Sequence, residues 1–144
     1  MPTVFDVAKY FLDTLGSMST WKLQKLCYYA QAWTLAWDSV ELFPEEFQAW
    51  SNGPVCFDLF QKHKGMFMID SAEFPYGDPS KITAPQKENI DIICRDYGDK
   101  DAYWLREQTH GEDPWKNARG NTPVGEPGQE IITKDSMGSY YGSL

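Results

Sequence analysis

The chain has 144 residues, and its thirteen lysines and arginines against twenty-one aspartates and glutamates give a net charge of −8 at neutral pH. This charge opposes approach to phosphate backbones and anionic membranes and favours a basic partner, although acidic solvated faces are common. Hydrophobic residues make up 42% and aromatic residues 15% of the chain, which argues against disorder. We predict one domain over residues 1–144, because a chain of this size buries about 70% of its unfolded surface.

Cysteine usage and hydropathy indicate the compartment. Cys27, Cys56 and Cys94 are isolated, without a CxxC pair, so neither a zinc site nor a disulfide framework is indicated. The sequence shows no signal peptide and no apolar run long enough to cross a membrane. We therefore expect a cytoplasmic location and no membrane association.

The first half of the chain centres on one unusually apolar segment. Residues 3–15 are predicted to form an amphipathic helix that ends at Gly16. Residues 20–38 follow, with Ser19 or Thr20 as the N-cap, and they are apolar on almost every side. Such a helix is normally surrounded by others. The sequence therefore predicts a compact all-α fold of six to seven helices around residues 20–38.

The middle of the chain is less clear. Over residues 44–52, a proline followed by two glutamates suits a helix start, but an Asn-Gly-Pro sequence stops it within about two turns. A short helix and an extended edge both remain open there. Residues 55–62 have helical spacing, and residues 63–82 are interpreted as a surface loop, with a short strand or hairpin in 66–82 as the alternative.

The second half gives stronger signals. A Thr-Ala-Pro-Gln capping sequence starts a helix over 83–98. A helix over 100–108 and a short helix from Trp115 follow, separated by a turn. Residues 120–130 contain three glycines and two prolines, so we predict a flexible connector to a short C-terminal helix capped by Thr133.

The sequence contains no arrangement typical of an enzyme: GxSxG, P-loop and GxGxxG motifs are all absent. His110, Glu112 and Asp113 form the only cluster that could bind a metal or move protons, but their spacing is not a known ligand pattern. The other histidine, His63, lies in a polar His-Lys-Gly turn. We interpret His110 as capping the carbonyls of its helix, with Trp115 packed under the turn. We expect no enzymatic activity, no catalytic residue, no metal and no cofactor.

Basic residues form only local pairs, Lys22 with Lys25 and Lys62 with Lys64. A nucleic-acid groove needs a longer basic stripe with interleaved aromatic residues. We interpret these lysines as solvated side chains that lie over aromatic surface. The chain alone is not expected to bind nucleic acid.

Three ordered segments carry a family resemblance: KLQKLCYYAQAW at 22–33, AWSNGPV at 49–55 and THGEDPW at 109–115. Together they resemble the SocA-like antitoxin family, also called the Panacea domain, which includes the phage-associated GepA proteins. The resemblance covers residues 4–118 and the last helix. Its motif positions, interpreted as structural, are Leu23, Lys25, Leu26, Tyr29, Ala30, Trp33, Ala49, Trp50, Gly53, Pro54, Val55, Thr109, His110, Pro114 and Trp115.

The resemblance implies a non-enzymatic antitoxin that neutralises a cognate protein toxin, encoded by an adjacent gene, by direct binding. It further implies a role as an adaptor that delivers the toxin to a protease. The alternative is a prophage or mobile-element protein with a small-ligand or structural role and no toxin partner. The oligomeric state stays open.

The chain has more aromatic residues than a core of this size requires, which indicates exposed rings that anchor a partner. Trp50 has two interpretations, an anchor of its turn on the core, which we favour, or an exposed partner anchor. The residues that we expect at a partner interface are Trp21, Lys25, Trp50, Asn52, Tyr103 and Trp104.

Overall fold

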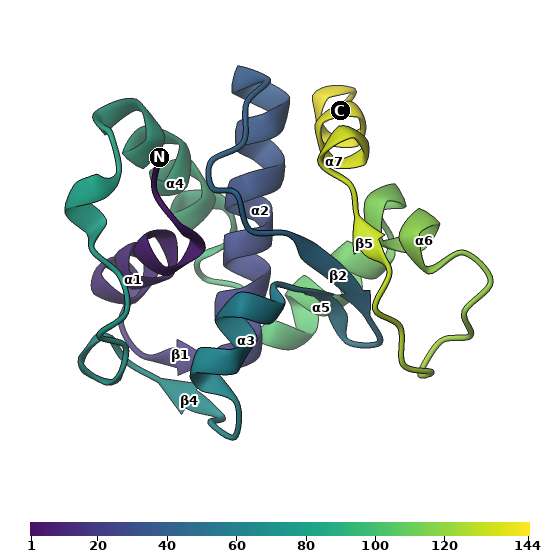
Figure 1. Ribbon diagram of the computed structural model, residues 1–144, viewed down its shortest axis with the longest axis horizontal. Coiled ribbons are helices and arrows are strands. Elements are labelled where there is room, and N and C mark those ends of the chain that lie inside the picture. Colours follow the sequence, from purple (N-terminus) through teal and green to yellow (C-terminus); the bar gives the residue numbers. More distant parts are fainter.

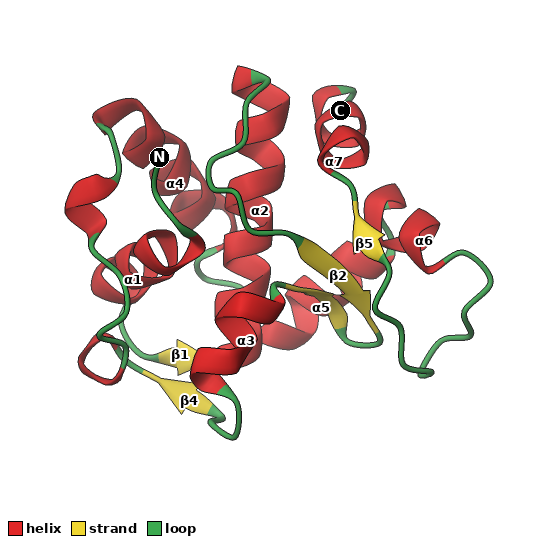
Figure 2. Cartoon of the chain, viewed as in Figure 1, coloured by secondary structure: helices red, strands yellow, loops and turns green.

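The computed structural model describes residues 1–144 and is mostly helical (Figures 1 and 2). Figure 1 shows α2 running through the middle, with α1 and α4 on one side of it and α6 and α7 on the other. Two single 3₁₀ turns, Ser71–Glu73 and Pro79–Lys81, lie between α3 and α4. The helices are α1 (Val4–Leu15), α2 (Thr20–Asp38), α3 (Phe57–His63), α4 (Ala84–Tyr97), α5 (Ala102–His110), α6 (Asp113–Arg119) and α7 (Lys134–Gly142).

Helix α2 is the buried centre of the fold, as predicted. Ser19 caps it by accepting a hydrogen bond from the Lys22 backbone N–H at 3.1 Å, and α1, α4, α5 and α7 all pack against it. The predicted burial fails only at the C-terminal end of the helix. Trp33 is half-buried and Trp37 is 42% exposed, and the two rings stack on each other.

The expectation of a purely all-α fold was wrong, because five short strands accompany the helices (Figure 2). Strands β1 (Met18–Ser19) and β4 (Met68–Ile69) form an antiparallel pair, so the short strand considered within 66–82 is confirmed. Strands β2 (Phe47–Trp50), β3 (Gly53–Val55) and β5 (Ile131–Ile132) form a second antiparallel sheet in the order β3-β2-β5.

The hairpin of β2 and β3 resolves the open choice over residues 44–52 in favour of extended structure. Its register pairs Trp50 with Gly53 and Ala49 with Pro54, which leaves a two-residue turn. Gly53 has φ +114°, a conformation that L side chains rarely adopt. Pro54 has no backbone N–H to donate. It is tolerated because β3 is an edge strand, where a proline need not interrupt the hydrogen bonds between strands.

The side chains of two glutamines in α2 form hydrogen bonds with the backbone of neighbouring loops. The Gln31 amide donates to the Phe43 carbonyl at 2.7 Å and its oxygen accepts from the Leu42 N–H at 2.7 Å. Gln24 makes the same two bonds with one residue, Cys56, at 3.1 and 2.8 Å. The glutamines are seven positions apart, so they lie on one face of the helix. The amide oxygen of each gives a loop N–H, of Leu42 or Cys56, the acceptor that a buried backbone donor needs.

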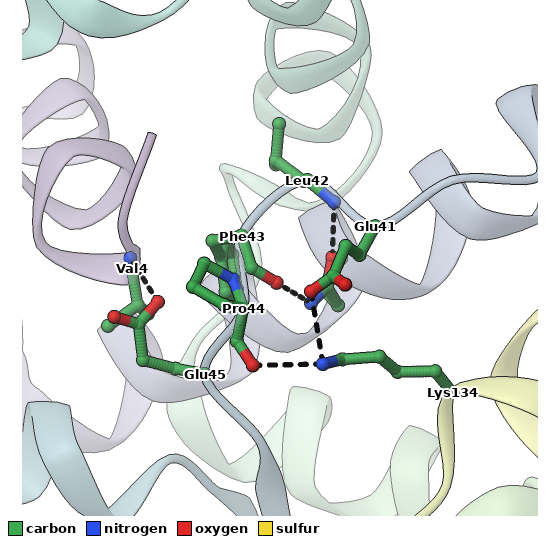
Figure 3. A network of polar contacts seen from close by, with 8 residues as sticks. Val4, Glu41, Leu42, Phe43, Pro44, Glu45 and Lys134 are labelled. Atoms are coloured by element: carbon green, nitrogen blue, oxygen red, sulfur yellow. Dashed lines mark hydrogen bonds and ion pairs between the residues drawn. The ribbon is translucent and has the colours of Figure 1, made fainter. Parts of the chain in front are cut away.

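The loop after α2 also joins both ends of the chain (Figure 3). The backbone N–H of Val4, at the start of α1, donates to the Glu45 carboxylate at 2.9 Å. From the start of α7, the Lys134 ammonium donates to the Pro44 carbonyl at 2.9 Å and to the Glu41 carboxylate at 3.1 Å. Residues 41–45 therefore connect α1 and α7 across the end of α2.

Residues 120–130 contain no helix or strand. The buried Arg119 guanidinium fixes this segment by donating to the carbonyls of Pro123 and Glu126 at 2.8 and 2.7 Å, and it also donates to Ala49 of β2 at 3.1 Å. The C-terminal helix begins after Thr133, whose hydroxyl accepts from the Ser136 N–H, as predicted. No helix of the fold is both long and apolar enough to cross a membrane.

Candidate functional site

Lys25 is buried in the interior, and the interpretation of this lysine as a solvated side chain was wrong. It is 1% exposed, and no protein atom accepts a hydrogen bond from its Nζ. Its aliphatic chain packs against Gly53 of the hairpin, where an added Cβ would come within 2.5 Å of Lys25 Cε. The Trp21 ring lies 5.2 Å from Nζ, within range of a cation–π interaction.

A cavity of about 230 Å³ lies over this lysine, between α2, the hairpin turn and α5. We call it the α2–α5 cavity. Tyr103 is 67% exposed, and Asn52 is exposed as well. The cavity brings together Trp21, Lys25, Asn52 and Tyr103, four of the six residues predicted for a partner interface. Its lining consists of Trp21, Lys25, Asn52, Ala102, Tyr103 and Arg106.

The other two predicted interface residues lie outside this cavity. Trp104 is exposed on α5, with the Lys100 ammonium 5.1 Å from its ring. The Trp50 ring packs on Phe60 of α3 at 5.0 Å, and its indole N–H donates to Gln48 at 2.8 Å. Trp50 thus holds the hairpin against α3, which agrees with the structural interpretation that we favoured.

The electrostatics of the cavity are cationic. Burial, together with the nearby Arg106 guanidinium, lowers the pKa of Lys25 to about 7. The buried Nε of Arg106 also has no hydrogen-bond partner, and the nearest acid recorded for Arg106 is Glu107, at 3.8 Å from its terminal nitrogen. No carboxylate lines the cavity, so neither the Lys25 ammonium nor the Nε of Arg106 meets a counter-charge within it.

The THGEDPW segment packs against the β2–β3 hairpin. His110 stacks on Trp115, with ring centroids 3.8 Å apart, and the Trp115 indole donates to the Trp50 carbonyl at 2.9 Å. The packing of Trp115 under the turn is confirmed, but the proposed capping by His110 was wrong: the Gly111 N–H bonds the last carbonyls of α5. Burial and Arg106 lower the pKa of His110 to about 4, so its ring is neutral at pH 7.

Sequence reasoning missed the environment of Glu112. This carboxylate is buried and accepts hydrogen bonds from the Tyr29 and Tyr141 hydroxyls, both at 2.7 Å; burial raises its pKa. It therefore joins α2 to α7 rather than forming a site with His110. The structure brings no three metal-ligating side chains together.

His63 was also misplaced, since it does not lie in a polar turn. Its ring is buried, and Nε2 lies 2.9 Å from the Gln24 amide nitrogen. Neither environment had a signal in the sequence, because both depend on residues far away in the chain.

Replacing Gly53 with alanine is expected to lower the free energy of unfolding by about 2–3 kcal/mol, because the new Cβ meets Lys25 and the backbone stays strained. Gly125→Ala is the matched control, since Gly125 also has a positive φ but open space around it; about 1–2 kcal/mol is expected there. Urea denaturation measures both, and equal losses would contradict the close packing of Gly53 on Lys25.

The fold and this cavity define a small, mostly helical protein in which two sequence motifs, in α2 and in the hairpin, contribute Lys25 and Asn52 to one cavity that Arg106 of α5 also lines. The model of the family described as antitoxin SocA-like, Panacea domain, matches residues 23–116, and the chain belongs to this family. The match confirms the resemblance carried by the motifs, and the family is generally non-enzymatic. No curated protein and no solved structure matched significantly.

Proposed function

We propose that this protein is an antitoxin that neutralises a protein toxin by binding it directly through the rim of the α2–α5 cavity. The observation that carries this proposal is the gathering of Trp21, Lys25, Asn52 and Tyr103 at one cavity. Family membership supports the toxin–antitoxin role. The partner is a toxin encoded by an adjacent gene, and binding takes place in the cytoplasm.

The rim has the chemistry of a partner anchor. Tyr103, at the cavity, is exposed on α5, and tyrosine is one of the residues that dominate the energetics of many interfaces. The next residue, Trp104, is also exposed but lies outside the cavity. The net charge of −8 speeds encounter with a basic toxin, so the association rate should fall as salt rises.

Co-expression with the adjacent reading frame tests the proposal. The intact chain should rescue growth and purify with the toxin, and Tyr103→Ala should weaken the complex by about tenfold or more, because an aromatic anchor contributes 1.4 kcal/mol or more. The variant should still fold, since a surface substitution changes stability by about 0.5 kcal/mol or less. Tyr76→Ala, which removes an exposed ring outside the cavity, is the matched control and should bind normally. Rescue without a detectable complex would overturn direct binding.

The same experiment separates sequestration from delivery to a protease. If binding alone neutralises, the toxin persists in the complex at its normal level. If the protein acts as an adaptor, the half-life of the toxin shortens when both are expressed, and deleting the protease restores it.

A further inference from the structure

We propose that the α2–α5 cavity binds a carboxylate of the toxin between Lys25 and Arg106, and that this carboxylate is the polar anchor of the complex. The inference rests on the proposed function and names the chemistry of the partner group. The carboxylate comes from an aspartate or glutamate side chain, or from the end of the toxin chain.

The unpaired donors carry the argument. Lys25 is fully enclosed, and no group of the protein accepts a hydrogen bond from its ammonium. The Arg106 side chain is 32% exposed and pairs with Glu107, but its buried Nε also has no acceptor. Leaving a buried cation unpaired is strongly unfavourable. A cavity lined by one such cation and by an arginine with an unpaired Nε is suited to receive an acceptor from outside, and stability is commonly given up in this way at functional sites.

The walls of the cavity select the kind of acceptor. Trp21, Ala102 and Tyr103 supply apolar surface, and the Asn52 amide adds a neutral polar group near the hairpin turn. At about 230 Å³, the cavity is smaller than the roughly 300–1,000 Å³ of typical small-molecule pockets. A short side chain with a charged tip fits these dimensions: the tip reaches the cations and the methylene groups lie against the rings.

Charge over the whole molecule argues against a phosphate polymer as the occupant. The chain carries −8 overall, and a nucleic acid needs an extended basic surface to replace its counterions. Two cations in an enclosed space suit a single carboxylate, for which charge-assisted hydrogen bonds are short and strong.

Capped peptides test the inference on the isolated protein. The probes are a tripeptide with a central glutamate and both ends blocked, the same peptide with glutamine, the glutamine peptide with a free carboxyl end, and acetate. The Trp21 indole N–H resonance in NMR reports occupancy. A carboxylate peptide should bind in the millimolar range, and the blocked glutamine peptide about tenfold or more weakly.

The pattern among the probes decides between sources. Preference for the blocked glutamate peptide indicates a side chain, and preference for the free carboxyl end indicates a chain terminus. Equal binding of the neutral and charged peptides, or no saturation with any probe, overturns the inference. If acetate binds as tightly as the peptides, the cavity is a site for a free anion, and the proposal that it anchors a toxin carboxylate is wrong.

Two variants show whether a loss of carboxylate binding comes from the Lys25 ammonium itself rather than from misfolding or from the change in net charge. Lys25→Met removes the ammonium while keeping a similar shape, so carboxylate binding should be lost in a folded protein. Lys64→Met removes one charge from the exposed surface and should bind like the wild type. In co-expression, Lys25→Met should also lose rescue; if it neutralises the toxin normally, the carboxylate anchor is wrong while direct binding stands.

Discussion

Lys25→Met is expected to raise the free energy of unfolding by about 2–4 kcal/mol at pH 7. The pKa of this lysine falls from an ordinary value of 10.5 to about 7 in the fold, and each unit corresponds to about 1.4 kcal/mol. The loss of the cation–π interaction with Trp21 offsets part of this gain, by about 0.5–2 kcal/mol. Urea denaturation of the two proteins measures the difference, and a variant less stable than the wild type would contradict an unpaired buried ammonium.

The pH dependence of this difference follows from linkage. The pKa of Lys25 is lower in the folded state than in the unfolded state, so the unfolded chain binds more protons between the two values. The penalty is fully present below about pH 7 and disappears as pH rises towards 10.5. The gain in free energy of unfolding from Lys25→Met should therefore shrink as pH rises. A gain that stays constant with pH would indicate that it comes from packing rather than from the charge.

Other titratable groups do not contribute to the pH dependence of this stability difference. The pKa values of His63 and His110 are lowered by burial, so both rings are neutral above pH 7. The buried thiol of Cys27 has a raised pKa and destabilises the fold at alkaline pH in both proteins. Subtracting the wild-type curve from the variant curve removes these shared contributions.

Gln24→Ala is expected to lower the free energy of unfolding by about 3–6 kcal/mol, the largest loss that we expect from one polar side chain. It leaves the Cys56 N–H and the Nε2 of the buried His63 ring without the Gln24 side chain as their partner, and each buried unsatisfied group costs about 1–3 kcal/mol. The Cys56 carbonyl loses one donor but still accepts from the Phe60 N–H at 2.9 Å. The cavity left by the shortened side chain adds to this loss.

Gln61→Ala is the matched control for this prediction. Gln61 is exposed on α3, so removing it should change stability by about 0.5 kcal/mol or less. Urea denaturation reports both variants, and Gln31→Ala, which breaks the equivalent pair of bonds to residues 42 and 43, should resemble Gln24→Ala. A loss for Gln24→Ala as small as that of Gln61→Ala would show that these hydrogen bonds contribute little.

The helices could be predicted because their signals are local. Thr3 and Thr83 each form a capping box in the structure, and Ser19 and Thr133 cap their helices through the side chain. The hairpin was missed because strands of three and four residues are too short to show a period. Asn52 is the second residue of its turn and Gly53 is the first residue of β3. An Asn-Gly pair is a hairpin signal, but beside a proline it indicated only the end of a helix.

The cavity could be predicted only in part. Exposed aromatic anchors were expected from composition, and Trp21 and Tyr103 do lie at its edge. The burial of Lys25 could not be predicted, because it depends on α5, which begins 77 residues later at Ala102. The same holds for Glu112, whose two tyrosine donors come from opposite ends of the chain.

The C-terminal helix α7 determines when the molecule can finish folding. It lies beyond the region matched by the family, yet it covers α2, and its Tyr141 hydroxyl lies 3.2 Å from that of Tyr28, 113 residues earlier. Contacts this far apart in sequence form slowly. During translation, α2 therefore leaves the ribosome long before its last covering helix, and the core closes only after the final residues have been released.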